Sequence, residues 1–235
     1  MSDKTTAITA SMVSELRSRT GAAMMDCKKF LVLTNGDIDK AIEEMRKAGA
    51  AKAAKRQGNI TAEGIIAIHS DHASHAAALA EINCETDFVA KAADFQEFAD
   101  QIAKRVLETQ TTDLAALLAS PYRAESSETI ETTRQNLVAK IGENISIRRV
   151  ALIKTDNIVA SYSHGSRIGV LVEIQGGSLE LGKEMAMQVA ASRPEVVTPE
   201  QVPAELIAKE REIFIAQASE SGKPQDIIEK MVSGR

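Results

Sequence analysis

The sequence of 235 residues has very few aromatic residues: they make up 3% of the chain, and tryptophan is absent. Hydrophobic residues still account for 44%, so the chain can bury cores built from aliphatic side chains and alanine. Each of the five phenylalanines is then an uncommonly large apolar group. The position of a phenylalanine in this chain therefore bears on packing or binding.

The chain also has no excess of basic residues, since its net charge is −5 and its pI is about 5.5. Broad non-specific binding of nucleic acid needs a positive surface, so this balance argues against it and allows only a local basic patch. Residues 46–58 form such a patch, with five positive charges and no negative ones. Because it has little apolar content to bury, we interpret this segment as a linker in the form of a solvated helical connector. Binding to an acidic partner surface is the alternative.

Cysteines are few, and long hydrophobic runs are missing. Cys27 and Cys84 are far apart and form no Cys-x-x-Cys pair, which indicates a reducing compartment without a disulfide framework. The first six residues are polar and lack the apolar centre of a signal peptide. No apolar run approaches the roughly 18 residues that span a bilayer. We therefore expect a soluble, cytoplasmic protein.

Catalytic motifs are absent as well: there is no glycine-rich phosphate loop, nucleophile elbow or His-Glu-x-x-His sequence. A zinc site could be sought only in three evenly spaced histidines, His69, His72 and His75, which makes a metallohydrolase the weakest alternative. A nucleophilic pair of Cys84 and His164 is less favoured than a buried thiol at the end of a strand. The sequence thus predicts no enzyme, no cofactor and no metal.

The periodicity of apolar residues predicts an α+β fold. Residues 1–57 contain three short amphipathic helices, with Thr9 and Asp37 as N-caps and with Gly21 and Asn35–Gly36 as stop signals. The expected strands are 64–69, 75–84, 145–153, 158–163 and 168–174, and the expected core helices are 87–107, 128–144 and 180–192. Helices over 199–219 and 226–232, separated by a Gly/Pro loop, suggest an antiparallel hairpin. The predicted domains are 1–57, 58–147 and 148–196, the last two being core halves with antiparallel sheets, and a helical arm over 197–235.

A strand ends and a helix begins within residues 83–90 (NCETDFVA). Thr86 or Asp87 can cap that helix, and a carboxylate is favoured at its positive end. Phe88 then lies in the first turn, where a place in the core is hard to satisfy. The residues alone leave two interpretations open: a phenylalanine at the edge of the core, or a probe for a partner.

Several segments resemble signatures of the bacterial elongation factor Ts family. They are RTGAAMMDCKK at 19–29 followed by NGD at 35–37, NCETDFVA at 83–90, KIGENISIRR at 140–149, and YSHGSRIGVL at 162–171. The resemblance runs from about residue 8 to the end of the chain. Members of this family bind the GDP form of elongation factor Tu, the GTPase that carries aminoacyl-tRNA, and promote release of GDP.

The resemblance implies a three-helix N-terminal domain like a ubiquitin-associated (UBA) domain, a two-part α+β core and a coiled-coil helical hairpin. It also implies that four residues dislodge Mg²⁺ from the GTPase, with Phe88 inserting between elements of the GTPase domain: Thr86, Asp87, Phe88 and Val89. Further contacts with the partner are implied for Met24, Met25, Asp26, Cys27, Lys28, His164 and Gly165. Nucleic acid and membranes are not expected as partners.

Longer members of the family continue past the position of Arg235, so we interpret the chain as a shortened form or a proteolytic product with an incomplete arm. The arm could also join two copies of the chain. Two other functions stay open at this point. One is a general protein-binding module with a UBA-like domain, and the other is an RNA-binding protein that uses the basic residues 46–56.

Overall fold

A computed structural model describes residues 7–219 of the chain. Within this range the chain divides into two compact units, residues 7–190 and residues 191–219. Helices and antiparallel strands occur together, which confirms the α+β class. None of the helices within the described range is both long and apolar enough to cross a membrane.

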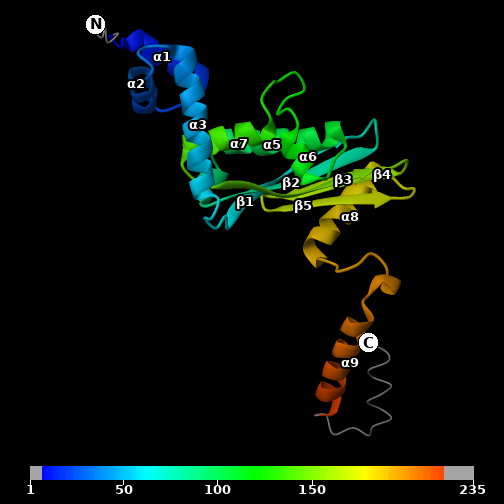
Figure 1. The fold of residues 1–235 in the computed structure, drawn as a ribbon. Coiled ribbons are helices and arrows are strands. Elements are labelled where there is room, and N and C mark those ends of the chain that lie inside the picture. Colours follow the sequence, from blue (N-terminus) through cyan, green and yellow to red (C-terminus); the bar gives the residue numbers. More distant parts are fainter. Residues whose placement is uncertain (1–6, 220–235) are drawn as a thin grey trace. The chain divides into compact units, whose positions relative to one another are not determined.

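The first unit begins with the three expected helices, α1 (Ala10–Thr20), α2 (Met24–Leu33) and α3 (Ile38–Arg56) (Figure 1). Thr9 Oγ1 accepts a hydrogen bond from the backbone N–H of Met12, and Gly21 ends α1 with a φ of 66°. Asp37 caps α3 in the same way as Thr9 caps α1. One small core joins the helices and consists of Val13, Leu16, Cys27, Leu31 and Ala41.

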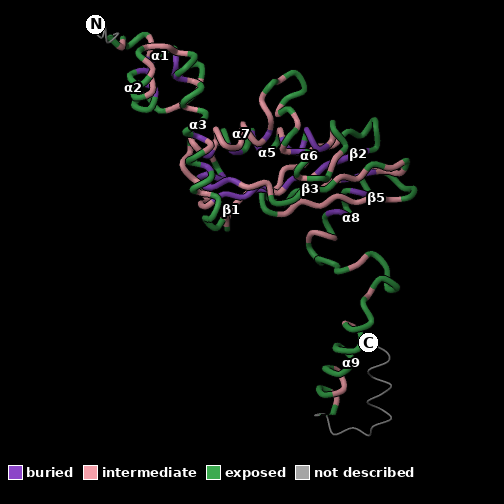
Figure 2. The backbone as a smooth tube through the Cα atoms, viewed as in Figure 1, coloured by how far each residue is buried: buried purple, intermediate pink, exposed green. Residues whose placement is uncertain are grey.

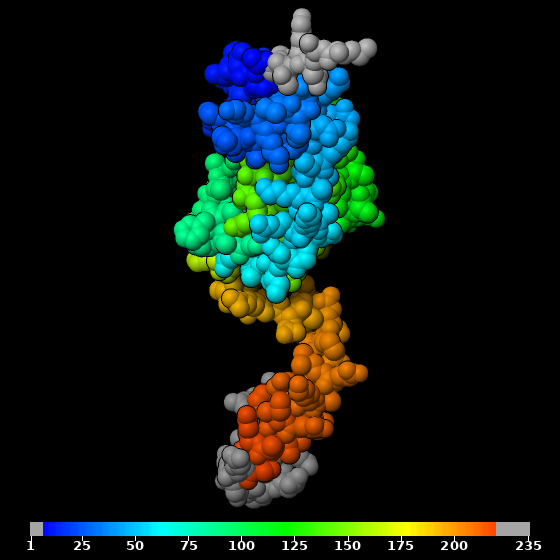
Figure 3. All heavy atoms as spheres, turned by 60° about the vertical axis from the view of Figure 1, so that its left-hand side comes forward, coloured from blue at the N-terminus to red at the C-terminus, as the bar shows by residue number. Residues whose placement is uncertain are grey.

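The interpretation of residues 46–58 as a helical connector is confirmed as far as Arg56, where α3 ends, but this half of the helix is not wholly solvated. Two small residues, Gly49 and Ala53, are buried on this half of the helix. A Cβ on Gly49 would lie 3.3 Å from the Cβ of Ala139 in α7 (Ile130–Ile141). Small side chains thus let α3 pack closely against the rest of the unit (Figure 3).

Most basic side chains of this half of α3 contact the protein itself. Arg46 pairs with Glu128 at 2.9 Å, and Lys52 Nζ donates to the Ala139 carbonyl at 2.8 Å. Arg56 lies 3.7 Å from a carboxylate oxygen of Glu85. These contacts pair much of the positive charge with acceptors of the protein itself. They argue against an RNA-binding patch on this half of α3.

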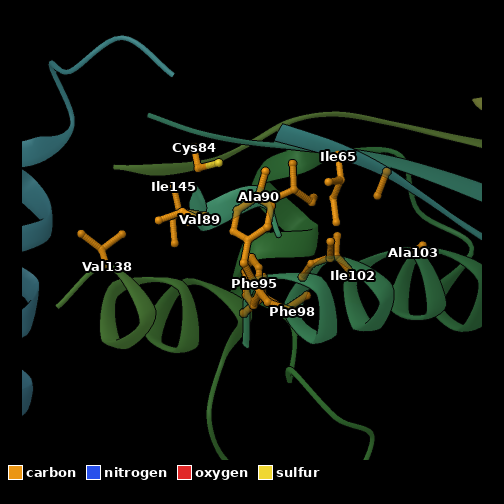
Figure 4. Packing of buried hydrophobic residues seen from close by; sticks show 14 of the residues in the cluster. Ile65, Cys84, Val89, Ala90, Phe95, Phe98, Ile102, Ala103, Val138 and Ile145 are labelled. Atoms are coloured by element: carbon orange, nitrogen blue, oxygen red, sulfur yellow. The ribbon is translucent and has the colours of Figure 1, made fainter. Parts of the chain in front are cut away.

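The first sheet has the order β1-β2-β3 and is antiparallel, with β1 (Glu63–Asp71), β2 (Ala76–Cys84) and β3 (Ile145–Lys154). Helices α5 (Ala93–Thr109), α6 (Leu114–Ala119) and α7 cover one face of it (Figure 1). Phe95 and Ile102 of α5 face Ile65 and Ile145 of the sheet (Figure 4). This is the main core, and its buried side chains are mostly aliphatic, as the composition predicts.

The single helix predicted over 87–107 is wrong. The chain forms a one-turn helix, α4 (Asp87–Ala90), and then breaks before α5. Ala92 is extended, with φ −70° and ψ 137°, and acts as the N-cap of α5. Because of this break, residues 87–90 and 93–109 need not share one apolar stripe. Helix α6 was not expected from the sequence.

The second sheet pairs β4 (Ile158–His164) with β5 (Ile168–Ile174). It lies close to the first sheet: the backbone N–H of Ile66 donates to the Ser166 carbonyl at 2.7 Å, and a Cβ on Gly169 would lie 2.5 Å from Ile66 Cγ2. The predicted boundary between core halves at 147/148 falls inside β3, which pairs with β2 along its length. A boundary that separates the two sheets must lie after Lys154.

Helix α8 (Leu179–Ser192) follows the second sheet, and a Cβ on its Gly182 would lie 2.7 Å from the Ala160 Cβ of β4. The second unit contains a short 3₁₀ turn, η1 (Pro199–Gln201), and α9 (Ala204–Ser219). None of the described residues of α9 is buried (Figure 2). The predicted helix 226–232 lies outside the described residues, so the hairpin arm and pairing through it stay predictions.

Candidate partner-binding site

Phe88 is the most conspicuous side chain at the junction of β2 and α5. Its side chain is 81% exposed, whereas the next two residues, Val89 and Ala90, are buried. Val89 and Ala90 point into the main core beside Cys84 and Phe95 (Figure 4). Half of α4 thus anchors the helix, while Phe88 projects into solvent. The interpretation of Phe88 as part of the core edge is wrong.

The residue before Asp87 fixes the start of α4. Thr86 Oγ1 accepts from the Val89 N–H at 3.5 Å, which confirms Thr86 as the cap. The same hydroxyl donates to Glu143 Oε1 at 2.6 Å, and the Thr86 N–H donates to Glu143 Oε2 at 3.0 Å. A helix of four residues cannot hold itself together in water. Its geometry is therefore imposed by Thr86, Glu143 and the core.

Asp87 places a negative charge next to Phe88. Lys91 Nζ donates to its carboxylate at 2.8 Å. This hydrogen bond lowers the pKa of Asp87 below its ordinary value, and the charge of nearby Arg167 acts in the same direction. The Asp87 side chain is therefore ionised at neutral pH while 44% of it stays exposed. A partner that meets Phe88 also meets this carboxylate.

The turn between β4 and β5 lies at the same end of the sheets as α4. It contains His164 and Gly165, both exposed, and Gly165 has a φ of 60°. The next cation, Arg167, pairs with Glu63, which lies opposite Cys84 in the sheet. The fold thus brings together two of the predicted contact segments that are about eighty positions apart in the chain. Tyr162 O–H lies 3.1 Å from His164 Nδ1 and restrains the imidazole.

The third predicted contact segment is part of α2. Met24 and Met25 are 56% and 74% exposed, and Asp26 and Lys28 are also exposed. Cys27 is fully buried in the three-helix core, so its side chain is not available for direct contact with a partner. Helix α2 packs on the first half of α3, whereas α4 lies near the end of α3. The surfaces of α2 and α4 therefore lie toward opposite ends of α3, a helix of 19 residues that is about 28 Å long.

Neither the histidines nor the cysteines form a reactive site in the described part of the chain. Residues 7–219 contain no group of three His, Cys, Asp or Glu side chains that could hold a metal ion. His75 Nδ1 contacts the Asn157 carbonyl at 2.6 Å and so has a structural role. Burial raises the pKa of the Cys84 thiol to about 11, with a smaller effect from the charge of Glu143. This thiol is protonated, and a poor nucleophile, at neutral pH.

Comparison with known proteins identifies the family. The family model described as Elongation factor TS matches residues 85–235. Elongation factor Ts of Alkalilimnicola ehrlichii is 54% identical over 97% of this chain and 78% of its own length, and that of Thioalkalivibrio sulfidiphilus gives the same values. Elongation factor Ts of Legionella pneumophila is 53% identical over 97% of this chain and 77% of its own length. The chain belongs to the elongation factor Ts family.

An elongation factor Ts is the guanine-nucleotide exchange factor of elongation factor Tu, and this is the role of the chain in translation elongation. It binds elongation factor Tu and promotes nucleotide exchange. Two side chains that the sequence did not single out belong to this end of the molecule, Glu143 and Arg167. Both lie in the segments that resemble elongation factor Ts, but only the fold shows that they reach Thr86 and Glu63.

Proposed function

We propose that residues 86–89 disturb the Mg²⁺ and phosphate site of elongation factor Tu, with Phe88 as the inserted side chain. The observation that carries this proposal is an 81% exposed phenylalanine on a fixed one-turn helix. Such a side chain gains most of its possible burial energy only when a partner covers it. The nearby Asp87 carboxylate adds a negative charge that can compete with the ligands of a cation.

The magnitude of this effect is limited. Covering Phe88 contributes about 1.5–3 kcal/mol, which is enough to support a local rearrangement in the partner but not to replace the whole affinity for GDP. Mg²⁺ requires nearly ideal octahedral geometry, so a small displacement of its surroundings weakens its binding. Loss of the ion then leaves the phosphates of GDP without part of their countercharge.

Other surfaces must hold the partner during this step. We infer that the UBA-like three-helix unit docks through Met24, Met25, Asp26 and Lys28, and that His164 and Gly165 contact a separate part of elongation factor Tu. The exposed methionines of α2 are suited to such contact because their side chains are flexible and polarizable. Because residues 86–89 fit best when the Mg²⁺ site is disturbed, the factor favours the nucleotide-free partner, and nucleotide must weaken binding of the factor by the same coupling.

Chelation of Mg²⁺ tests this mechanism. Release of fluorescent GDP from elongation factor Tu is measured with and without the factor, first in millimolar Mg²⁺ and then in excess EDTA. We expect the acceleration by the factor to shrink severalfold in EDTA, because the chelator has already removed the ion that residues 86–89 displace. The same acceleration in both buffers would contradict the Mg²⁺ mechanism. Elongation factor Tu alone in each buffer is the control.

A further inference from the structure

The carboxylate of Glu143 accepts three hydrogen bonds from the two residues that precede Asp87. The backbone N–H groups of Glu85 and Thr86 donate to its Oε2 at 3.2 and 3.0 Å, and Thr86 Oγ1 donates to its Oε1 at 2.6 Å. Glu143 lies between α7 and β3, and 57 positions separate it from Thr86. One side chain thus orients both peptide groups from which α4 starts.

Glu85 makes the reciprocal contact. Its Oε1 accepts from the Asn144 backbone N–H at 2.6 Å and from Asn59 Nδ2 at 2.9 Å. These hydrogen bonds, the first above all, lower the pKa of Glu85 and keep it ionised. Each of two neighbouring loops therefore offers a glutamate to the backbone of the other. We call Glu85, Thr86, Glu143 and Asn144 the clasp.

The clasp does more than hold the end of β2. It joins two glutamates and their loops, with Arg56 3.7 Å from a carboxylate oxygen of Glu85 as a countercharge. Burial of Cys84 and its pairing with Glu63 and Ile145 already fix the end of β2. What the clasp holds in addition is the segment after Cys84, which leads to α4.

We propose that Glu143 is a positioning residue for nucleotide exchange, which holds α4 so that Phe88 is already oriented before elongation factor Tu arrives. This inference rests on the proposed role of Phe88. Fixing the helix in advance removes an ordering cost from the step in which Phe88 inserts. A displaced reactive or inserting group loses rate steeply, by up to about a hundredfold for 1 Å in enzymes. Glu143 itself does not touch the partner in this scheme.

The expected consequence separates rate from affinity. In Glu143→Ala the two N–H groups and the Thr86 hydroxyl lose their common acceptor, so α4 samples other orientations. We expect the maximal rate of GDP release, at saturating factor, to fall about tenfold. The factor concentration at half-maximal rate should change much less, because α2 and the β4–β5 turn keep their surfaces. Glu143→Gln keeps the shape and one acceptor oxygen, and its effect should be intermediate.

The matched control is Glu131→Ala. Glu131 is also partly buried and accepts hydrogen bonds from Arg134 at 2.8 and 2.6 Å and from Gln135 at 2.7 Å, but all its partners lie on α7. This variant shows how much the rate of GDP release falls when a half-buried carboxylate is removed from a hydrogen-bond network far from Thr86. Hydrogen exchange at the amides of Glu85 and Thr86 gives a local readout, and we expect faster exchange in Glu143→Ala but not in Glu131→Ala.

The deciding measurement is a double-mutant cycle with Phe88→Ala. If the clasp acts through Phe88, Glu143→Ala should slow release in the wild-type background and have no further effect in Phe88→Ala. Equal slowing in both backgrounds would overturn the positioning role. So would a wild-type maximal rate in Glu143→Ala and Glu143→Gln if the amides of Glu85 and Thr86 exchange faster in those variants. A wild-type rate in Phe88→Ala would instead refute the proposed role of Phe88, which keeps the two failures distinct. If Glu143→Ala does not fold, the cycle is run with Glu143→Gln.

Discussion

Phe88→Ala is expected to slow factor-stimulated release of GDP from elongation factor Tu by about tenfold to a hundredfold, which is the rate equivalent of losing 1.5–3 kcal/mol of apolar burial. The effect should fall on the maximal rate, because Phe88 is used when the Mg²⁺ site is disturbed and α2 can still dock. Stopped-flow fluorescence with labelled GDP, over a range of factor concentrations, measures both quantities.

The fold should be unaffected by this substitution. Phe88 is 81% exposed and belongs to no core cluster, so the free energy of unfolding should change by less than about 0.5 kcal/mol. Val197→Ala is a matched control, since Val197 is 92% exposed and lies outside α4. A Phe88→Ala protein that releases GDP as fast as wild type would leave exchange as the function but exclude Phe88 as its inserted side chain.

Local features of this fold could be predicted from the sequence because a few adjacent residues determine them. Thr9 and Asp37 form caps as expected since a short polar side chain reaches the N–H groups of the next turn without help from the rest of the chain. The five strands are also placed within one or two residues, because alternating apolar residues and turn signals define them.

Features that depend on distant residues could not be predicted in this way. The basic half of α3 has the composition of a linker, and only the meeting of Gly49 with Ala139 makes it part of the packed unit. The same is true of the site. Phe88 could be singled out by position, but its exposure depends on how Val89 and Ala90 pack. Contacts between segments far apart in the chain leave no periodic pattern in either one.

The family resemblance supplied roles that the fold then qualified. It implied contacts for five consecutive residues of α2, but a helix shows a partner only part of its circumference. Cys27 faces the small core, while Met24, Met25 and Lys28 face outward. The contact surface of α2 is therefore narrower than the motif. Conversely, Glu143 lies within a recognised segment without an implied role, because its contact with Thr86 exists only in the folded chain.

Gly64→Ala is expected to destabilise the first unit by about 3 kcal/mol, among the largest effects of a single methyl group in the chain. Gly64 has a φ of 155°, and a Cβ built there would overlap the carbonyl oxygen of Ile82 and lie 2.8 Å from the Cα of Asn83. Both atoms belong to the backbone of β2, so no side-chain rotation can relieve the clash. The strand pairing itself must shift.

Thermal unfolding measures this effect, and a drop in Tm of about 5–10 °C is expected for a unit of this size. Gly58→Ala is the control, because a Cβ on Gly58 meets no atom within 4 Å.

The distortion caused by Gly64→Ala should also reach the site that promotes nucleotide exchange. Gly64 pairs with Asn83, and its neighbour Glu63 pairs with Cys84 and binds Arg167 beside α4. A loss of maximal exchange rate at temperatures where Gly64→Ala is still folded would therefore show that the edge of β1 supports α4. An unchanged Tm would contradict the predicted destabilisation, because it would show that the pairing of β1 with β2 accommodates a Cβ at position 64.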